Sequence, residues 1–312
     1  MSDSLAGAAT DVPGVSDAPA GRIAGSDESG RVRTAGWLLL AAFAMWLVSL
    51  FAIDLTAMTD VGLVSVLPWS FFVALALLTV GFLYVNEYVS SRRLLVWGYL
   101  VLLSAIAHAT PALLSGNVRY AWSYRHLGVA EFISRNGGVA SDAEFQQIDH
   151  AWPGMPSLTA LLAEVTGLAP ATIALWMPFA VSLVSLLALS VVYRSFVDDP
   201  RVRSLALWLF VIANWVGQEY FSPQGVAYVL YLALLAIVIP FDRKQRSRSG
   251  HFELRAGNDF RPTDAGNVVV SILGVLIVIA ITGTHLLTPI MVIVTFGILS
   301  ASRVVRSTWV SL

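Results

Sequence analysis

The chain of 312 residues contains no cysteine and has few charged side chains. Without cysteine it forms neither disulfides nor thiolate metal sites. Asp, Glu, Lys and Arg make up 12% of the residues and hydrophobic residues 57%, whereas charged residues approach about a quarter of a soluble globular domain. With a mean hydropathy of +0.73, the composition excludes an ordinary soluble globule and indicates a membrane protein.

Several motifs of soluble enzymes and pumps are also missing. There is no Walker loop, no G-x-G-x-x-G and no G-x-S-x-G, so ATP-driven pumping and serine hydrolysis have no support. The five histidines show neither H-x-x-x-H nor H-E-x-x-H spacing, so we expect no zinc site. A hard divalent cation held by carboxylates and a substrate phosphate needs no fixed spacing, and the sequence leaves that cofactor open.

The N-terminal residues 1–33 differ in composition from the rest of the chain. Residues 1–30 are mostly Ser, Asp, Gly, Ala and Pro, which bury too little apolar surface to offset the entropy of ordering. We therefore expect a disordered cytoplasmic tail over 1–33 and a transmembrane domain over 34–312. No short basic region followed by an apolar run opens the chain, so the first apolar run is expected to be a retained helix and not a cleaved signal peptide.

Apolar runs recur along the whole transmembrane domain. They lie at 36–53, 63–85, 94–114, 171–193, 203–217, 225–241, 267–284 and 286–301. A helix that spans a bilayer needs about 20 residues, so the first four runs are long enough and the last four form two short, tightly connected pairs. The sequence predicts an all-α, polytopic helical membrane protein with about eight transmembrane helices.

The basic residues alternate with these runs. Clusters in the N-terminal tail and in every second connection contain Arg22, Arg31, Arg33, Arg92, Arg93, Arg194, Arg201, Arg203, Arg243, Lys244, Arg246, Arg248, Arg255, Arg261, Arg303 and Arg306. Only Arg119, Arg125 and Arg135 fall in the other connections. Because cytoplasmic loops retain Lys and Arg, the pattern predicts a cytoplasmic N-terminus. Short clusters beside apolar runs are typical of topology signals, so a lipid bilayer and not nucleic acid is the expected partner.

Two long connections follow from this topology. The outer loop, 115–170, contains two amphipathic segments, 123–135 and 157–166, which we expect to lie flat on the outer leaflet. Their predicted apolar faces are Tyr124, Leu127, Ala130 and Ile133 in the first, and Leu158, Leu161, Leu162 and Val165 in the second. Asn136-Gly137-Gly138 and Gly167 are expected to end these helices. The charged loop 242–266 is expected to be a solvated cytoplasmic anchor.

Four polar and aromatic clusters lie on the predicted outer face. They are Arg119–His126, Asp149–Gly154, Gln218–Gly225 and Thr284–Pro289. Ionisable side chains near a membrane are costly to place, which favours a functional interpretation. Structural alternatives remain open: Trp152-Pro153-Gly154 as a turn with an interfacial anchor, and His285 as an ordinary turn residue. His108 and Asn214, inside apolar runs, are expected to bond neighbouring helices.

The order of segments from the third run onward resembles the polytopic glycosyltransferases of the GT-C class. A span, 94–114, precedes a large outer loop with two juxtamembrane helices, and Trp152-Pro153-Gly154-Met155-Pro156 opens the second helix. Thr166-Gly167 then precedes the next span. The stretches 214–224 and 285–289 resemble a subset of actinobacterial envelope proteins of that class. The resemblance covers about 94–301.

This resemblance implies transfer of a sugar from a polyprenyl-phosphate donor to an envelope glycan or lipid acceptor on the outer face. Asp149 or Glu219, of which we favour Glu219, would act as the catalytic base. Arg119 and Arg125 would bind the phosphate. The expected substrate-binding residues are completed by Tyr124, His126, His150, Trp152, Gln218, Tyr220 and His285.

The sequence departs from the GT-C pattern in two respects. The early outer loop has no carboxylate before Glu131, where the class usually has an acidic pair, and the chain stops at Leu312 as if cut from a longer protein. Two other classes therefore stay open. A transporter or flippase subunit for a lipid-linked sugar predicts charged or broken helices at mid-membrane, and a non-catalytic membrane scaffold predicts that the outer carboxylates are dispensable.

Overall fold

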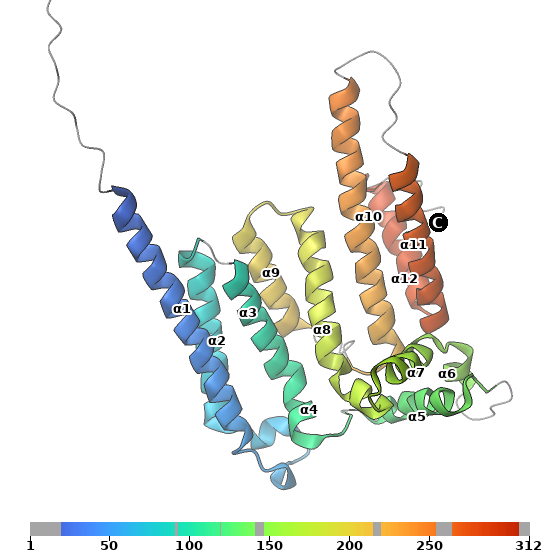
Figure 1. The fold of residues 1–312 in the computed structure, drawn as a ribbon, viewed down its shortest axis with the longest axis horizontal. Coiled ribbons are helices and arrows are strands. Elements are labelled where there is room, and N and C mark those ends of the chain that lie inside the picture. The colour runs from blue at the N-terminus through green and yellow to red at the C-terminus, as the bar shows by residue number, and fades with distance from the viewer. Residues whose placement is uncertain are drawn as a thin grey trace, which may run out of the picture.

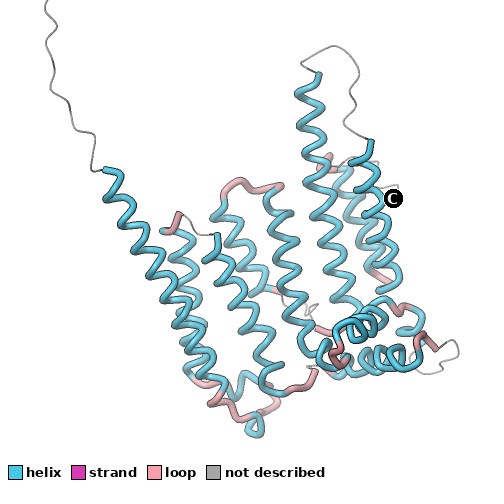
Figure 2. Tube along the Cα trace, viewed as in Figure 1, coloured by secondary structure: helices cyan, strands magenta, loops and turns pink. Residues whose placement is uncertain are grey.

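The computed structural model describes residues 20–90, 93–118, 120–140, 147–214, 220–253 and 264–305. Over these residues the chain is helical with no strand, apart from an isolated bridge between Thr59 and Gly62. The predicted all-α class is confirmed for this part of the chain (Figures 1 and 2).

The long helices run side by side in one row, in which α9 lies beside α3 and α8 (Figure 1). In chain order they are α1 (Ala20–Leu50), α2 (Trp69–Tyr88), α3 (Arg93–Ser104), α8 (Pro170–Arg194), α9 (Pro200–Ala213), α10 (Pro223–Glu253), α11 (Asp264–Thr284) and α12 (Thr288–Ala301). A π-helical turn, η3 (Ala105–Ala109), continues α3 into α4 (Thr110–Ser115). Short 3-10 turns, η1 (Leu55–Ala57) and η2 (Leu63–Val66), connect α1 to α2.

Five of the helical stretches in the described residues are long and apolar enough to cross a membrane. They are Asp27–Leu50, Trp69–Tyr88, Arg93–Ser115, Pro170–Arg194 and Pro223–Arg243. Val268–Thr284 and Thr288–Ala301 are apolar but shorter. With 14 residues, α9 is about 21 Å long at 1.5 Å per residue, less than the roughly 30 Å hydrocarbon layer. The length and composition of the helices therefore support a multi-pass membrane protein.

Two apolar cores hold the row together. The larger one joins α1, α2, α3, α8, α9 and α10, and the smaller joins α8, α10, α11 and α12. In the larger core Tyr99 lies across Gly81 and donates its hydroxyl to the carbonyl of Ala35 at 2.7 Å. A Cβ at Gly81 would meet that hydroxyl at 2.2 Å, so the close contact of α1, α2 and α3 requires glycine there.

Several predicted boundaries are wrong. Helix α1 begins at Ala20, so the described part of the predicted tail is helical, with Arg31 donating to the carbonyl of Tyr88 and pairing with Asp27. The run at 63–85 starts with the turn η2 and becomes α-helix only at Trp69, after Pro68. Helix α10 continues through Pro240 to Glu253 and α11 begins at Asp264, so most of the predicted loop 242–266 is helical.

The described residues of the predicted outer loop 115–170 form three helices, where the sequence predicted two. They are α5 (Ala121–Asn136), α6 (Gln147–Ala151) and α7 (Gly154–Thr166). All three lie across one end of the row, beside the ends of α8, α10 and α11 (Figure 1). The start of α1, the end of α2, the start of α3, the α8–α9 connection, the end of α10 and the start of α11 lie at the other end. The arginine-rich segments that the structure describes therefore share one end of the molecule, as the alternation predicted.

Candidate functional site

The end of the row that carries α5, α6 and α7 is built around Gly154. A Cβ on this residue would lie 2.3 Å from Oγ1 of Thr284 and 2.9 Å from the carbonyl oxygen of Gly283. Only glycine therefore allows the start of α7 to approach the end of α11 so closely. Since α6 ends at Ala151 and α7 starts at Gly154, this contact also brings Asp149 and Trp152 beside the α11–α12 turn.

The glycines that end the helices in this region were predicted correctly. Gly137 and Gly167 follow α5 and α7 with φ of 71° and 72°, the left-handed conformation that glycine adopts without a Cβ clash. The predicted apolar face of α5 needs one correction. Leu127, Ala130 and Ile133 are buried, but Tyr124 is 51% exposed and Ser123 takes the inward position.

The side chains of α7 divide between two faces of the helix. Small and medium side chains pack against the protein, namely Met155, Pro156, Thr159, Ala160 and Ala163. The large apolar residues point away from it, with Leu158 42%, Leu161 55%, Leu162 40% and Val165 75% exposed. The narrow face with small side chains lets α7 lie close to α5 and α8. The leucine face makes no such contact and is of the kind that binds a membrane or another protein.

A cleft of about 450 Å³ opens between these elements. Its lining consists of Trp122, Arg125, His126, Asp149, Trp152, Tyr220, Pro223, Gln224, Thr284, His285, Leu286 and Leu287. Segments far apart in the sequence thus meet in one place: α5, α6, the α6–α7 turn, the start of α10 and the α11–α12 turn. Six residues predicted for the site line it, Arg125, His126, Asp149, Trp152, Tyr220 and His285.

Asp149 is the polar centre of the cleft. Its side chain is 5% exposed, its Oδ2 accepts a hydrogen bond from Nε of Arg125 at 2.5 Å, and its Oδ1 lies 3.1 Å from Nδ1 of His126. The last contact is an ion-pair distance whose angle departs from that of an aligned hydrogen bond. A buried carboxylate needs such partners, because an unpaired charge away from water is very costly.

The terminal amino groups of Arg125 are not used in its contact with Asp149. The Asp149 contact uses only Nε, and the guanidinium lies 5.5 Å from the ring centre of Trp122. The terminal amino groups of an arginine remain able to donate two parallel hydrogen bonds to a phosphate or carboxylate. With 30% of its side chain exposed, Arg125 can reach a ligand in the cleft while it holds Asp149.

Aromatic and amide groups form a further part of the lining. The hydroxyl of Tyr220 donates to Oε1 of Gln224 at 3.0 Å, and its ring meets that of Tyr120 edge to face at 5.2 Å. His285 is held by a 2.8 Å hydrogen bond between Nδ1 and Oγ1 of Thr288. The cleft therefore combines one cation, one paired carboxylate, two histidines and several flat aromatic surfaces.

Both histidines of the cleft titrate below the usual range. Burial lowers the pKa of His126, against the attraction of the Asp149 carboxylate, and Arg125 lowers it further. Burial likewise lowers the pKa of His285. Neutral imidazoles are thus favoured near pH 7, the state in which one ring nitrogen can accept a proton.

Two predicted site residues in the described part of the chain do not line the cleft. Tyr124 is exposed on the far side of α5. His150 turns away to accept from the backbone N–H of Ala140 at 3.3 Å and to meet Phe132 edge to face. Consecutive residues on a helix point in different directions, so Asp149 and His150 cannot both face inward. Arg119, Gln218 and Glu219 lie outside the described residues.

Sequence reasoning missed several lining residues. Trp122, Gln224, Thr284 and the pair Leu286-Leu287 belong to the predicted clusters, but they were not chosen as site residues. Their position beside candidate charged residues was the available signal. It was weak because cluster membership does not tell which side chains of a short segment face the cavity.

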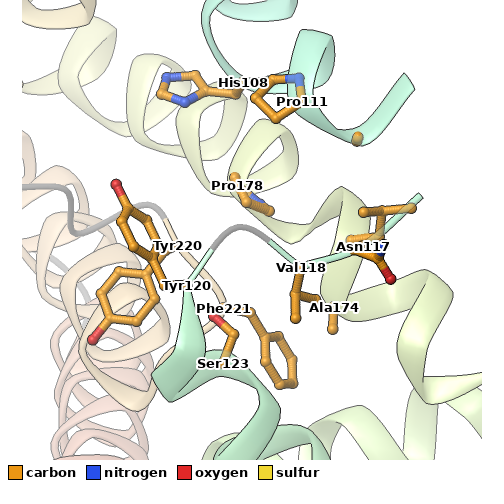
Figure 3. Close-up of a pocket in the computed structure, with 12 residues that line it drawn as sticks. His108, Pro111, Asn117, Val118, Tyr120, Ser123, Ala174, Pro178, Tyr220 and Phe221 are labelled. Atoms are coloured by element: carbon orange, nitrogen blue, oxygen red, sulfur yellow. The ribbon is translucent and has the colours of Figure 1, made fainter. Parts of the chain in front are cut away.

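A second, small cavity lies deeper, towards the bundle. It has a volume of about 20 Å³, which suits about one water molecule. His108 and Pro111 border it on one side and Tyr120, Tyr220 and Phe221 on the other, with Pro178 between them (Figure 3). Tyr220 lines both this cavity and the larger cleft, so the two adjoin at its side chain. The π-turn around His108 and the proline in α8 are the helix irregularities that a transport pathway would need, but the cavity is too small for a sugar.

No group of three or more His, Asp or Glu side chains suited to a metal ion occurs within the described ranges. The divalent cation that the sequence leaves open therefore gains no ligand set from those residues. We found no match for the chain among protein-family models, curated proteins or solved structures.

Proposed function

We propose that the chain is a glycosyltransferase-like membrane protein of the GT-C kind. In this proposal it crosses the bacterial plasma membrane about eight times, with its N-terminus in the cytoplasm. It transfers a sugar from a polyprenyl phosphate to an envelope glycan or lipid on the outer face. The observation that carries the proposal is the cleft, in which Arg125, His126 and Asp149 meet aromatic side chains at the end of the row away from the arginine-rich connections.

The cleft has the groups that this reaction requires. A polyprenyl phosphate leaves as an anion, and Arg125 offers its terminal amino groups to it. Trp122, Trp152 and Tyr220 present flat apolar surfaces of the kind against which sugar rings pack. The volume of about 450 Å³ is sufficient for a small glycan.

The geometry favours different roles for Asp149 and for the residue that accepts the proton. Asp149 uses both carboxylate oxygens on Arg125 and His126, which favours a positioning role for it. Its contact with Nδ1 of His126 favours the tautomer in which Nε2 accepts a proton, so His126 becomes a candidate base beside Glu219. In this scheme an acceptor hydroxyl loses its proton to one of these bases as it attacks the sugar carbon, and the bond to the phosphate oxygen breaks.

The exposed leucine face of α7 explains how a lipid donor would reach the cleft. A helix with its apolar residues outward and lying across the ends of spanning helices fits the boundary between headgroups and acyl chains. The phosphate of a donor anchored in that leaflet would then lie at the depth of Arg125. This placement also supports the outer-leaflet position predicted for α5 and α7.

Binding of the donor lipid is tested with the full chain in nanodiscs that contain polyprenyl monophosphate. We expect Arg125→Gln to weaken binding about tenfold, the loss of one charged hydrogen-bonding group. Arg135→Gln is the matched control, because Arg135 is on the same helix but is 76% exposed and pairs with Glu131. Equal binding by the wild type and Arg125→Gln would contradict the proposed phosphate site.

Transfer is tested in membranes that contain the chain and a labelled polyprenyl-phosphate sugar. His126→Gln, Asp149→Asn and Glu219→Gln are compared, and loss of the true base should lower transfer about 10²–10⁴-fold. Translocation of the donor without transfer would favour the flippase alternative. The scaffold alternative would remain if the chain neither transferred the sugar nor translocated the donor, and if all three variants replaced the wild-type protein in cells without loss of function.

A further inference from the structure

The opposite end of the molecule contains a cleft that the proposed transferase site does not use. It has a volume of about 510 Å³ and lies among α3, α8 and α9, with Ser90 at its edge. The lining is Ser90, Arg93, Leu94, Val96, Trp97, Ser190, Arg194, Pro200, Arg203, Ser204 and Leu207. Three arginines therefore meet in a lining that contains no carboxylate among the described residues.

The arginines are available to a ligand to different degrees. Arg203 donates to the carbonyls of Val197 and Asp198 at 2.9 and 3.1 Å, which fixes it against the α8–α9 connection. Arg93 and Arg194 make no ion pair with any residue in the described part of the chain. Two guanidiniums at the mouth of the cleft therefore have no ion-pair partner among the described residues, and like charges repel unless an anion lies between them.

Two nearby carboxylates accept hydrogen bonds from backbone N–H groups beside the cleft and do not themselves line it. Asp199 accepts from the backbone N–H of Arg201 at 2.7 Å, and Glu28 accepts from the backbone N–H of Ser90 at 2.8 Å. Arg201 pairs with Glu87 at 3.2 Å, outside the cleft lining. Arg194 also borders a neighbouring hollow that includes Asp198, but Asp198 does not line the arginine cleft.

The cleft changes character with depth. Arg93 and Trp97 are four residues apart on α3, and Arg203 and Leu207 are four apart on α9, so each pair lies on one helix face. Each arginine is at the end of its helix, and the apolar partner is one turn deeper. A charged mouth above an apolar floor is the pattern of a phospholipid, whose phosphate lies above its acyl chains. A soluble anion has no apolar part that would contact Val96, Trp97 and Leu207.

We propose that this cleft binds the phosphate of an anionic phospholipid, with an acyl chain along Trp97 and Leu207. Basic pockets between membrane helices on the cytoplasmic side are known to hold such headgroups. The bound lipid would neutralise the arginine mouth and join α3 to α9. It would stabilise the bundle from the leaflet opposite to the proposed transferase cleft.

Native mass spectrometry of the full chain, with phosphatidylglycerol or phosphatidylcholine added, measures this binding. We expect phosphatidylglycerol to bind more tightly than phosphatidylcholine. Each of Arg93→Gln and Arg194→Gln should weaken the phosphatidylglycerol complex about fivefold and the double variant about 25-fold, from the usual contribution of a basic residue near an anionic lipid. Arg203 is left intact because it holds the α8–α9 connection.

Arg201→Gln is the control, since it removes the same charge at the same end of the molecule without touching the cleft. It should bind phosphatidylglycerol like the wild type. An equal loss with Arg201→Gln would overturn the proposal in favour of general charge attraction. Protection against thermal unfolding by inorganic phosphate as strong as by phosphatidylglycerol would also overturn it, because a soluble anion would then suffice. The melting temperature of the double variant without added lipid is compared with that of the wild type, and equal values show that its fold is preserved.

Discussion

The carboxylate of Asp149 accepts a 2.5 Å hydrogen bond from Nε of Arg125, a residue 24 positions earlier in the chain. The contact joins α6 to α5 at the cleft. Asp149→Asn keeps the shape but removes the charge, leaving Arg125 without its counter-ion. We expect the free energy of unfolding to fall by about 1–3 kcal/mol, the usual contribution of a hydrogen bond to a charged group, measured as a lower melting temperature in detergent.

The reciprocal variant gives the control for this pair. Arg125→Gln should destabilise by a similar amount, and the double variant should lose less than the two effects added together, because each single change already removes the contact. Glu131→Gln, which breaks the exposed pair with Arg135, should change the melting temperature little. Additive losses in the double variant would show that Arg125 and Asp149 act independently.

Gly154→Ala should displace α7 from α11. The new Cβ would meet backbone atoms of Gly283 and Thr284 at 2.9 Å, and these cannot move aside as a flexible side chain could. We expect a loss of about 1–3 kcal/mol, together with weaker donor binding. Gly128→Ala in α5 is the matched control, because a Cβ on Gly128 would meet no atom within 4 Å and alanine favours a helix. A Gly154→Ala protein as stable as Gly128→Ala would contradict this packing.

Stability should decrease as the pH falls from about 7 to 5. The pKa of His126 is lowered from 6.5 in the folded protein, so below pH 6.5 the unfolded chain binds a proton that the folded chain resists. The stabilisation is complete above pH 6.5 and is lost as the pH falls towards the lowered value. The melting temperature at pH 7.5 and 5.5 should differ less in His126→Gln than in the wild type; an unchanged difference would rule out His126 as a contributor.

The orientation in the membrane is tested by two cysteines, one at each end of α8. Leu168 and Phe196 are 50% and 49% exposed, and the chain has no other cysteine. In intact cells Leu168→Cys should react with a membrane-impermeant thiol reagent and Phe196→Cys should not, because the arginine-rich end is predicted to be cytoplasmic. The opposite labelling would place the proposed transferase cleft in the cytoplasm.

The alternation of apolar runs and arginines was sufficient to predict a helical, multi-pass chain with its arginine-rich connections at one end. Hydropathy is local, since each helix satisfies its own backbone hydrogen bonds, and so it can be read from short windows. Glycine stops such as Gly137 and Gly167 were predictable for the same reason. The extension of α10 beyond Pro240 was missed because a proline is tolerated where packing holds the helix.

Which polar residues face the cleft was decided by the tertiary structure alone. Asp149 and His150 look equally suitable in the sequence, but only Asp149 meets Arg125, while His150 bonds to Ala140. Likewise Arg93, Arg194 and Arg203 read as topology signals, and only helix packing brings them together in one cleft. The sequence by itself determined which segments are apolar and which end carries the charge. Side-chain direction and long-range proximity depend on how whole helices pack, and packing is settled by all contacts of the folded chain together.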